Sequence, residues 1–560
     1  MSVAQRMMMQ GGGLPPIPPP DGVNYYGIAA TTTAPFGARD GAGLVSLNGT
    51  WYLLGGWNAT LPNEWSPTDV TTNEVWSSSD LVTWTKILAH DPVAPPSGPG
   101  ARWLPRHTFG YAVKDGYLWV IGGDAVLGPV PSDVWRSADG TTWERVAATS
   151  PWAYLSILGV LNGSFHIMGG TTSPYQHWRS ADGVTWEQLP DMPAGRSSVT
   201  QASVLASRIF ISGGLDADGT TQTSSTWMYD DVDGWVEMSA SAAWSEREWI
   251  ATASFGNRLW VLTGKHGVVN AGGLRYSTDG GVSWVEMDVY PYPPSHADSV
   301  FASDTTLVLA AGLASPGSVY RIQALPPDPS VTMASIAWTL WFDGTTYNPV
   351  TPVVFGKASA GNSASHQLVV SLVGGVPLQG EINGWPTIIM NGVDDVIRYT
   401  GAGEALDIIS RTAYTICFTG KLTTASGNSA TTYANAGIAS ESLAYFNIGM
   451  RTNGKLEAYH DGGSGTHADE DWSAGALVHY QIKYDGTNLK IRKGKGAWTS
   501  VAKSQIASAV LGPYAIGSRY DLTQFAGMEI CEYAATNVAL SDATLDLVAD
   551  DMAAKWGVIV

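Results

Sequence analysis

Residues 117–146 of this chain read YLWVIGGDAVLGPVPSDVWRSADGTTWERV. An apolar strand ends in a Gly pair, and the Asp115-Gly116 turn precedes that strand. Two tryptophans eight residues apart, Trp135 and Trp143, flank a further Asp-Gly turn. Asp-Gly turns between apolar runs join antiparallel strands. The stretch and its upstream hairpin partner therefore predict a unit of four short strands.

The same unit recurs along the chain, which makes internal repetition the main evidence for the fold. An apolar strand ending in Gly-Gly or a near equivalent occurs six times: WYLLGG (51–56), LWVIGG (118–123), FHIMGG (165–170), IFISGG (209–214), LWVLTG (259–264) and LVLAAG (307–312). An aromatic pair eight residues apart follows the first five: Trp76 and Trp84, Trp135 and Trp143, Trp178 and Trp186, Trp227 and Trp235, Tyr276 and Trp284. Six four-stranded units predict a six-bladed β-propeller.

The sixth repeat lacks its final aromatic residue, because SVYRIQAL runs directly into Pro326-Pro327. An unpaired outer edge would expose a template for aggregation. We therefore expect the upstream segment VNYYGIAA (23–30) to supply the missing outer strand and close the ring.

These repeats resemble two known blade signatures. The Gly-Gly and Trp spacing is similar to that of Kelch repeats, and the turns SADGTTW (137–143), SADGVTW (180–186) and STDGGVSW (277–284) resemble the Asp-boxes of sialidase-like propellers. The Asp of such a turn accepts backbone N–H bonds, and the Trp covers the blade edge. We expect these turns, on the face opposite the Gly pairs, to be scaffold.

A different pattern begins near Trp338, with short alternating strands such as YTICFTGKL and VHYQIKYDGTNLKIRKG. WTLWFDG (338–344), NGWPTIIMNGVDD (383–395) and the C-terminal stretch 528–558 resemble laminin-G or concanavalin A-like jelly rolls of phage and bacterial surface proteins. The last stretch reads as a strand, a Leu-Ser-Asp cap and a short amphipathic helix ending Ala-Lys-Trp-Gly. The predicted organisation of this all-β chain is an N-terminal arm (1–22), the propeller (23–325), a linker (326–335) and a concanavalin A-like β-sandwich (336–560).

Composition narrows the classes of function. A formal net charge of −19 without a local Lys/Arg cluster disfavours binding to nucleic acid or to anionic membranes. The N-terminus has no signal-peptide core, and no apolar run is long enough to insert in a membrane. We therefore expect synthesis in a host cytoplasm without Sec export. Cys417 and Cys531 lie in apolar strand-like runs and are expected to be buried free thiols.

Candidate ligand residues lie on the face where the Gly pairs end. Two long insertions there, 57–73 and 88–104, present Trp57, Trp65 and Trp103, whose rings suit sugar C–H faces. The alternative is that these tryptophans bury their own loops. Four arginines open first strands and could ring the channel mouth to bind an acidic glycan, or instead hydrogen-bond adjacent blades: Arg39, Arg106, Arg196 and Arg247. Asp124, Asp216 and His266, which follow Gly pairs, are further candidates.

No cofactor is expected. The stretch HDGGSGTHADED (460–471) offers oxygen ligands for Ca²⁺ but lacks EF-hand spacing, which favours a solvated acidic loop. A sialidase-like glycan hydrolase is the main enzymatic alternative, yet the Arg-Ile-Pro start is absent and no tyrosine can be paired with a glutamate. No Gly-x-Ser-x-Gly elbow is found either. These observations favour binding over catalysis.

The setting follows from the resemblance and from the arm MMMQGGGLPPIPPP, a flexible and polyproline tether that could dock on another subunit or remain disordered. We expect a virion component, either a tail fibre or receptor-binding protein or a head-decoration protein, that binds bacterial surface polysaccharide during adsorption. Other virion proteins would be its partners through the arm, and it could form a homo-oligomer. Purely structural decoration is a further alternative.

Overall fold

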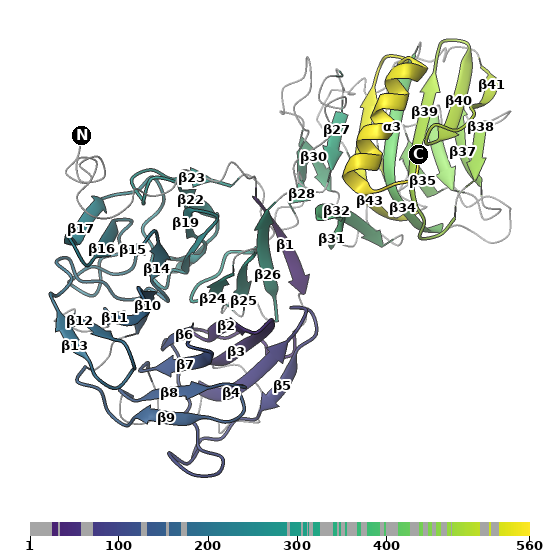
Figure 1. The fold of residues 1–560 in the computed structure, drawn as a ribbon. Coiled ribbons are helices and arrows are strands. Elements are labelled where there is room, and N and C mark those ends of the chain that lie inside the picture. The colour runs from purple at the N-terminus through teal and green to yellow at the C-terminus, as the bar shows by residue number, and fades with distance from the viewer. Residues whose placement is uncertain are drawn as a thin grey trace. The chain divides into compact units, whose positions relative to one another are not determined.

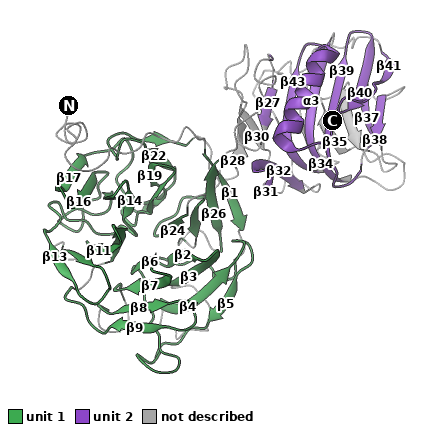
Figure 2. Ribbon diagram, viewed as in Figure 1, with its two compact units in different colours: residues 1–324 green, residues 325–560 purple. Residues whose placement is uncertain are grey.

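The computed structural model divides the chain into two compact units, residues 1–324 and 325–560 (Figure 2). In the first unit the structure describes residues 25–31, 34–57, 71–124, 131–152, 156–169, 176–287, 292–303, 306–310, 312 and 317–324. In the second it describes residues 336, 340–343, 347–348, 353–355, 367–370, 378–391, 397–398, 413–425, 436–440, 446–450, 455–460, 468–471, 473–503, 515–516 and 526–560. The predicted arm and linker lie outside the described residues.

The first unit is a ring of six four-stranded antiparallel sheets, which confirms the predicted six-bladed propeller (Figure 1). Blades 1 to 3 comprise β2 (Gly43–Leu47), β3 (Thr50–Trp57), β4 (Thr71–Ser78) and β5 (Thr85–Leu88); β6 (Gly110–Lys114), β7 (Tyr117–Ile121), β8 (Val134–Ser137) and β9 (Glu144–Ala147); and β10 (Ile157–Leu161), β11 (Ser164–Met168), β12 (His177–Ser180) and β13 (Glu187–Leu189).

Blades 4 to 6 comprise β14 (Ser203–Leu205), β15 (Arg208–Ser212), β16 (Thr226–Asp230) and β17 (Gly234–Ser239); β18 (Thr252–Phe255), β19 (Arg258–Val261), β22 (Arg275–Ser277) and β23 (Val285–Glu286); and β24 (Ser299–Ala302), β25 (Thr306–Ala310), β26 (Val319–Ala324) and β1 (Tyr25–Thr31). Blade 5 also carries a hairpin, β20 (Gly264–His266) and β21 (Val269–Ala271).

The ring closes as the sequence predicts. Strand β1 lies outside β26 in blade 6, with Tyr25 opposite Ala324 and Ile28 opposite Arg321. The innermost strands contact one another in a closed circuit, β2, β6, β10, β14, β18, β24 and back to β2. The first described strand thus fills the outer edge that the last repeat leaves open.

Each second strand is buried on both faces, which explains why it reads as an unbroken apolar run. In β7, Leu118 and Val120 pack with residues of blade 1, while Trp119 and Ile121 pack with residues of blade 3. Side chains of a strand alternate between its faces, so a sheet held between two neighbours needs apolar residues at consecutive positions. Adjacent blades therefore share their cores.

Internal hydrogen bonds hold the Asp-Gly turns of the blades. In blade 2 the Asp139 carboxylate accepts the backbone N–H groups of Thr141 and Thr142 at 2.7 Å each. The indole N–H of Trp143 then donates to the Gly140 carbonyl at 3.0 Å. Equivalent turns recur in blades 1, 3 and 5, at Asp80, Asp182 and Asp279.

A buried histidine pair lies between blades 3 and 4. His166 and His177, on neighbouring strands, are joined by an Nδ1 to Nε2 contact of 2.9 Å and pack against the Tyr229 ring. Burial lowers the pKa of His166 to about 4 and that of His177 to about 3, the latter also because His166 is close. Both imidazoles are therefore neutral near pH 7.

The described residues of the second unit form two antiparallel sheets and one helix (Figure 1). The eight-stranded sheet runs β31 (Leu378–Ile382), β32 (Trp385–Asn391), β43 (Ala526–Thr536), β34 (Tyr414–Ala425), β39 (Leu477–Tyr484), β40 (Asn488–Lys493) and β41 (Thr499–Ala502), with β27 (Leu340–Asp343) beside β43. The nine-stranded sheet runs β28 (Tyr347–Asn348), β29 (Val353–Phe355), β30 (Gln367–Val370), β33 (Ile397–Arg398), β42 (Ala515–Ile516), β35 (Ala436–Ser440), β36 (Phe446–Met450), β37 (Lys455–His460) and β38 (Ala468–Asp471).

The two faces of β34 serve two different cores. Ile416 and Phe418 share a buried cluster with Leu456 of the other sheet, whereas Cys417 packs beneath the helix with Cys531. Both cysteines are buried and free, which confirms that prediction. The second unit is thus layered as sheet, sheet and helix.

Helix α3 (Asp542–Trp556) has the ends that its sequence predicts. Ser541 caps the first turn by accepting the Thr544 N–H, and Gly557 ends the helix at φ 71°, a conformation that favours glycine. Three aspartates, four residues apart, pair with basic side chains of the sheet: Asp542 with Lys483, Asp546 with Arg492, and Asp550 with Lys495.

A fully buried ion pair also joins the helix to β43. Lys555 and Glu532 are 0% and 1% exposed in their side chains, with Nζ 3.1 Å from Oε2. The indole N–H groups of Trp341 and Trp556 donate to the same carboxylate at 2.6 and 2.9 Å. The Lys555 ammonium also lies 4.4 Å from the Trp385 ring centre. Both charges of this buried pair are therefore solvated by protein groups.

Candidate functional site at the channel mouth

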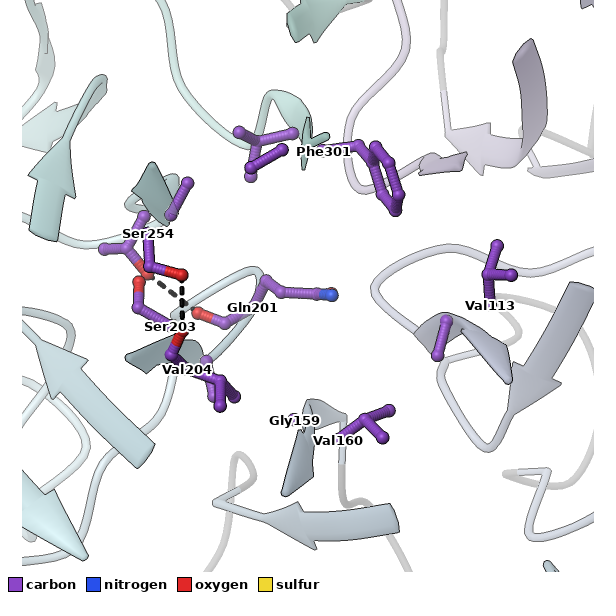
Figure 3. Close-up of a pocket in the computed structure, with 14 residues that line it drawn as sticks. Val113, Gly159, Val160, Gln201, Ser203, Val204, Ser254 and Phe301 are labelled. Atoms are coloured by element: carbon purple, nitrogen blue, oxygen red, sulfur yellow. Dashed lines mark hydrogen bonds between the residues drawn. The ribbon is translucent and has the colours of Figure 1, made fainter. Parts of the chain in front are cut away.

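The centre of the propeller contains a cavity of about 270 Å³ lined by the innermost strands (Figure 3). Val113, Val160 and Phe301 form apolar parts of its wall, and the Gln201 side chain extends toward its middle. The Ser254 hydroxyl donates to the Val204 carbonyl. None of the described residues that line the cavity is titratable. This part of the channel can admit a small group but offers no acid or base.

Polar side chains gather instead where the innermost strands begin. At this end a residue with positive φ precedes the first strand of blades 1, 2, 4, 5 and 6, and backbone bonds link several of these residues from blade to blade. The Gly41 N–H donates to Ala297 at 3.0 Å, and the Thr108 N–H donates to Gly41 at 2.8 Å. The Ala297 N–H in turn donates to Trp249 at 2.9 Å. The residues directly before these positions form what we call the mouth ring: Asp40, His107, Ser197, Glu248 and His296.

Four members of the mouth ring are held by two-way backbone bonds to the residues that leave the second strands. Asp40 pairs with Trp57 at 2.8 and 2.9 Å, and His107 pairs with Asp124 at 2.9 Å in both directions. Ser197 pairs with Leu215 and Glu248 with Lys265 in the same way. The fifth, His296, is held by a side-chain contact of 2.6 Å from Nδ1 to Asn270 Oδ1. Backbone bonds thus fix the main-chain positions of four members, from which their side chains extend.

Charges from blades 1, 2, 5 and 6 act on one another at this mouth. Burial raises the pKa of Asp40 to about 6, opposed by the positive charges of His107 and Lys265. Burial, with a contribution from Lys265, lowers the pKa of His296. Two buried atoms, Asp40 Oδ1 and His107 Nδ1, have no hydrogen-bond partner among the described residues.

Side-chain pairs complete the ring. His107 Nε2 lies 3.6 Å from Asp124 Oδ2, and Lys265 Nζ lies 3.6 Å from Glu248 Oε1. The contact with His107 lowers the pKa of Asp124. The half-buried Trp57 ring lies 6.5 Å from the His107 ring, centre to centre. The mouth therefore presents carboxylates, imidazoles, an ammonium and an aromatic ring together.

The four arginines do not line this mouth as exposed groups. All are 1–2% exposed, and the partners described here for each arginine lie in its own blade. Arg106 donates to the Gly122 carbonyl at 3.0 Å and pairs with Asp133 at 2.6 Å. Arg39 likewise donates to the Gly55 carbonyl and pairs with Glu74.

The other two arginines follow the same pattern. Arg196 pairs with Asp216 at 3.0 Å, and Arg247 donates to the Gly272 carbonyl at 3.1 Å and lies 5.8 Å from the Trp244 ring. The segment that carries each arginine leaves no room for a side chain at the second glycine of the pairs in blades 1, 2 and 4. Gly123 has φ 105°, and a Cβ there would lie 2.6 Å from Phe109 Cβ.

The predicted aromatic and acidic candidates separate into distinct places. Trp103 is fully buried, with its ring 5.6 Å from Phe109 and 5.9 Å from Trp143, so it packs its own long loop onto blade 2. Trp65 lies outside the described residues. Trp57 and Asp124 adjoin the mouth ring, and Asp124 is 56% exposed in its side chain.

His266 and the acidic stretch at 460–471 lie elsewhere. The exposed His266 is in the β20–β21 hairpin, where Nδ1 contacts the Glu246 carbonyl at 2.7 Å. In the acidic stretch, Asp469 and Asp471 lie on β38 and pair with Lys455, while residues 461–467 are outside the described residues. Within the described part of the chain, no group of three His, Cys, Asp or Glu residues is arranged to hold a metal ion.

The sequence-based prediction included none of the five mouth-ring residues, although the sequence holds a signal for four of them. Asp40, His107, Ser197 and Glu248 each follow directly after one of the four arginines. His296 follows Ser295 at the equivalent position of blade 6. The position directly after each arginine is therefore the sequence signal for the first four members, and it does not mark His296.

The comparisons with known proteins bear on the propeller. A family model described as the DUF6242 beta propeller domain matches residues 131–311. The matched range runs from just before β8 to just after β25, which agrees with the propeller architecture. A search of curated proteins finds no match. No helix among the described residues is long and apolar enough to span a membrane.

Proposed function

We propose that this protein is a virion component, a tail fibre, receptor-binding or head-decoration protein, that binds bacterial surface glycan through the mouth of its propeller. The observation that carries the proposal is the mouth ring itself. It gathers polar side chains from several blades beside the Trp57 ring.

The chemistry of the mouth suits a sugar. Carboxylates and imidazoles accept or donate hydrogen bonds to hydroxyl groups, and an aromatic face packs on sugar C–H groups. Asp40 and His107 each retain a polar atom without a partner among the described residues. A rigid backbone frame keeps such groups in place, so little ordering entropy is lost when a ligand binds.

Binding is favoured over hydrolysis by the way the arginines are used. A sialidase-type mechanism needs an arginine cluster open to the substrate carboxylate, whereas the arginines of these blades are buried against their own Gly pairs. The cavity deeper in the channel has no titratable group among its described lining residues.

The second unit fits the same role. Two antiparallel sheets that share a core, with one C-terminal helix, support its proposed identity as a concanavalin A-like lectin module. The virion setting rests on the resemblance of this module to phage proteins and on the Met-, Gly- and Pro-rich arm.

The test is binding of the full-length protein to a bacterial glycan array, together with its ability to block phage adsorption. We expect binding without release of reducing ends. Trp57→Ala and Asp40→Asn should each weaken binding at least tenfold, about 1.4 kcal/mol. The control Glu237→Gln, an exposed position on β17 of blade 4, should bind as the unaltered protein does.

Three results would contradict the proposal. Release of reducing ends would establish a hydrolase instead. Failure to bind any glycan or to block adsorption would favour a purely structural role. Full binding by both mouth variants would move the site away from the mouth ring.

A further inference from the structure

We infer that the mouth ring selects glycans without acidic groups, and that it rejects uronic, sialylated or phosphorylated chains. This inference rests on the proposed function and names its ligand class. It departs from the expectation that the four arginines receive an acidic glycan.

An acidic glycan needs exposed cations to bind its carboxylates. Recognition of a carboxylate is strongest with a bidentate arginine. Arg106 already pairs with Asp133, and Arg39 pairs with Glu74. The side chains of both arginines are 1–2% exposed, so neither is open to a ligand carboxylate. Arg247 is equally buried. A ligand carboxylate at the mouth thus meets no exposed arginine from this set.

Several exposed side chains on the segments at this end carry negative charge. Asp124 and Asp216 are 56% and 45% exposed in their side chains. Asp218 and Glu246 are exposed nearby in the chain, on the segments that follow β15 and β17. The Lys265 ammonium is shared with Glu248 at 3.6 Å. The exposed carboxylates of these segments therefore outnumber the cationic side chain Lys265, and the exposed imidazole of His266 lies among them.

The salt concentration sets the distance over which the protein repels an acidic ligand. The whole chain carries a formal net charge of −19, so the local field adds to a repulsive background. The screening length is about 30 Å at about 10 mM salt and about 8 Å at about 150 mM salt. Repulsion of an acidic ligand should therefore be strong at low salt and weaken as salt is added.

The experiment uses pairs of oligosaccharides with one core, one neutral and one carrying a carboxylate, with the full-length protein at both salt concentrations. We expect the acidic member of a bound pair to bind roughly tenfold more weakly at the lower salt, with the gap shrinking at the higher. Asp124→Asn together with Asp216→Asn should narrow the gap at low salt. Glu237→Gln, which also removes one negative charge, should leave it unchanged.

Tighter binding of the acidic members, weakened by salt and lost in Lys265→Ala, would overturn the inference while keeping the proposed function. An unchanged gap in the double variant would also overturn it, because the repulsion would then not come from the mouth. Absence of binding to every member would overturn the proposed function itself, so the two failures are distinguishable.

Discussion

Replacement of Arg106 by alanine separates a structural role from a ligand role at the channel mouth. The Arg106 side chain is 1% exposed and donates to the Leu104 and Gly122 carbonyls as well as to both oxygens of Asp133. Loss of one partner of a buried ion pair costs about 3–5 kcal/mol. Asp133 keeps one donor, the Trp135 indole N–H at 2.7 Å, so we expect about 3 kcal/mol.

The assay is urea unfolding of the full-length protein, with hydrogen exchange of peptides from residues 110–147 to assign the transition to blade 2. Arg136→Ala is the matched control, because Arg136 pairs with Glu144 at the surface, where such pairs are worth about 1 kcal/mol or less. An Arg106→Ala protein of unchanged stability that no longer binds glycan would refute this reasoning and restore the arginine as a ligand contact.

Two further predictions concern buried titratable groups elsewhere. Lys555→Met should destabilise the second unit by about 3–5 kcal/mol and release α3, because it leaves the buried Glu532 carboxylate without its partner. The double variant Lys555→Met with Glu532→Leu should recover much of that stability. Hydrogen exchange of the helix checks both variants, and a double variant as unstable as the single one would contradict the explanation. The folded-state pKa values of His166 and His177 lie below the ordinary value of 6.5, so the unfolded chain binds more protons and propeller stability should fall as pH drops from about 6.5 toward 3, by up to about 1.4 kcal/mol per pH unit for each histidine. His177→Phe should flatten that slope in urea unfolding between pH 4 and 6.5 relative to the unaltered protein, and an identical slope would show that the pair does not titrate on unfolding.

The ring of blades could be predicted from the sequence because its determinants are local and repeated. The Gly123 position needs a positive φ and no side chain, and the Asp139 turn needs its carboxylate within three residues. Such requirements leave the same short pattern in each repeat. Closure by β1 followed from the missing outer strand of blade 6.

The site could be predicted only in part, because ring closure brings together residues that are distant in the chain. Asp40 and Lys265 influence each other although they belong to blades 1 and 5. The burial of a side chain could not be predicted from the sequence either. An arginine or tryptophan on a turn-rich segment can face solvent or the core, and Arg106 and Trp103 are both buried. Whether such a side chain is exposed or buried depends on the partners it finds in the folded chain and not on its residue type.

Hydrogen exchange of the intact protein, measured with and without the bacterial polysaccharide that it binds, tests the division between scaffold and site most directly. We predict that protection on binding is confined to the segments that carry the mouth ring and Lys265, around residues 38–41, 106–108, 196–198, 247–249, 264–266 and 295–297. Protection centred on the turns at 78–84, 137–143 and 180–186, with the mouth segments unchanged, would contradict the account, because the repeated turns would then be the binding surface.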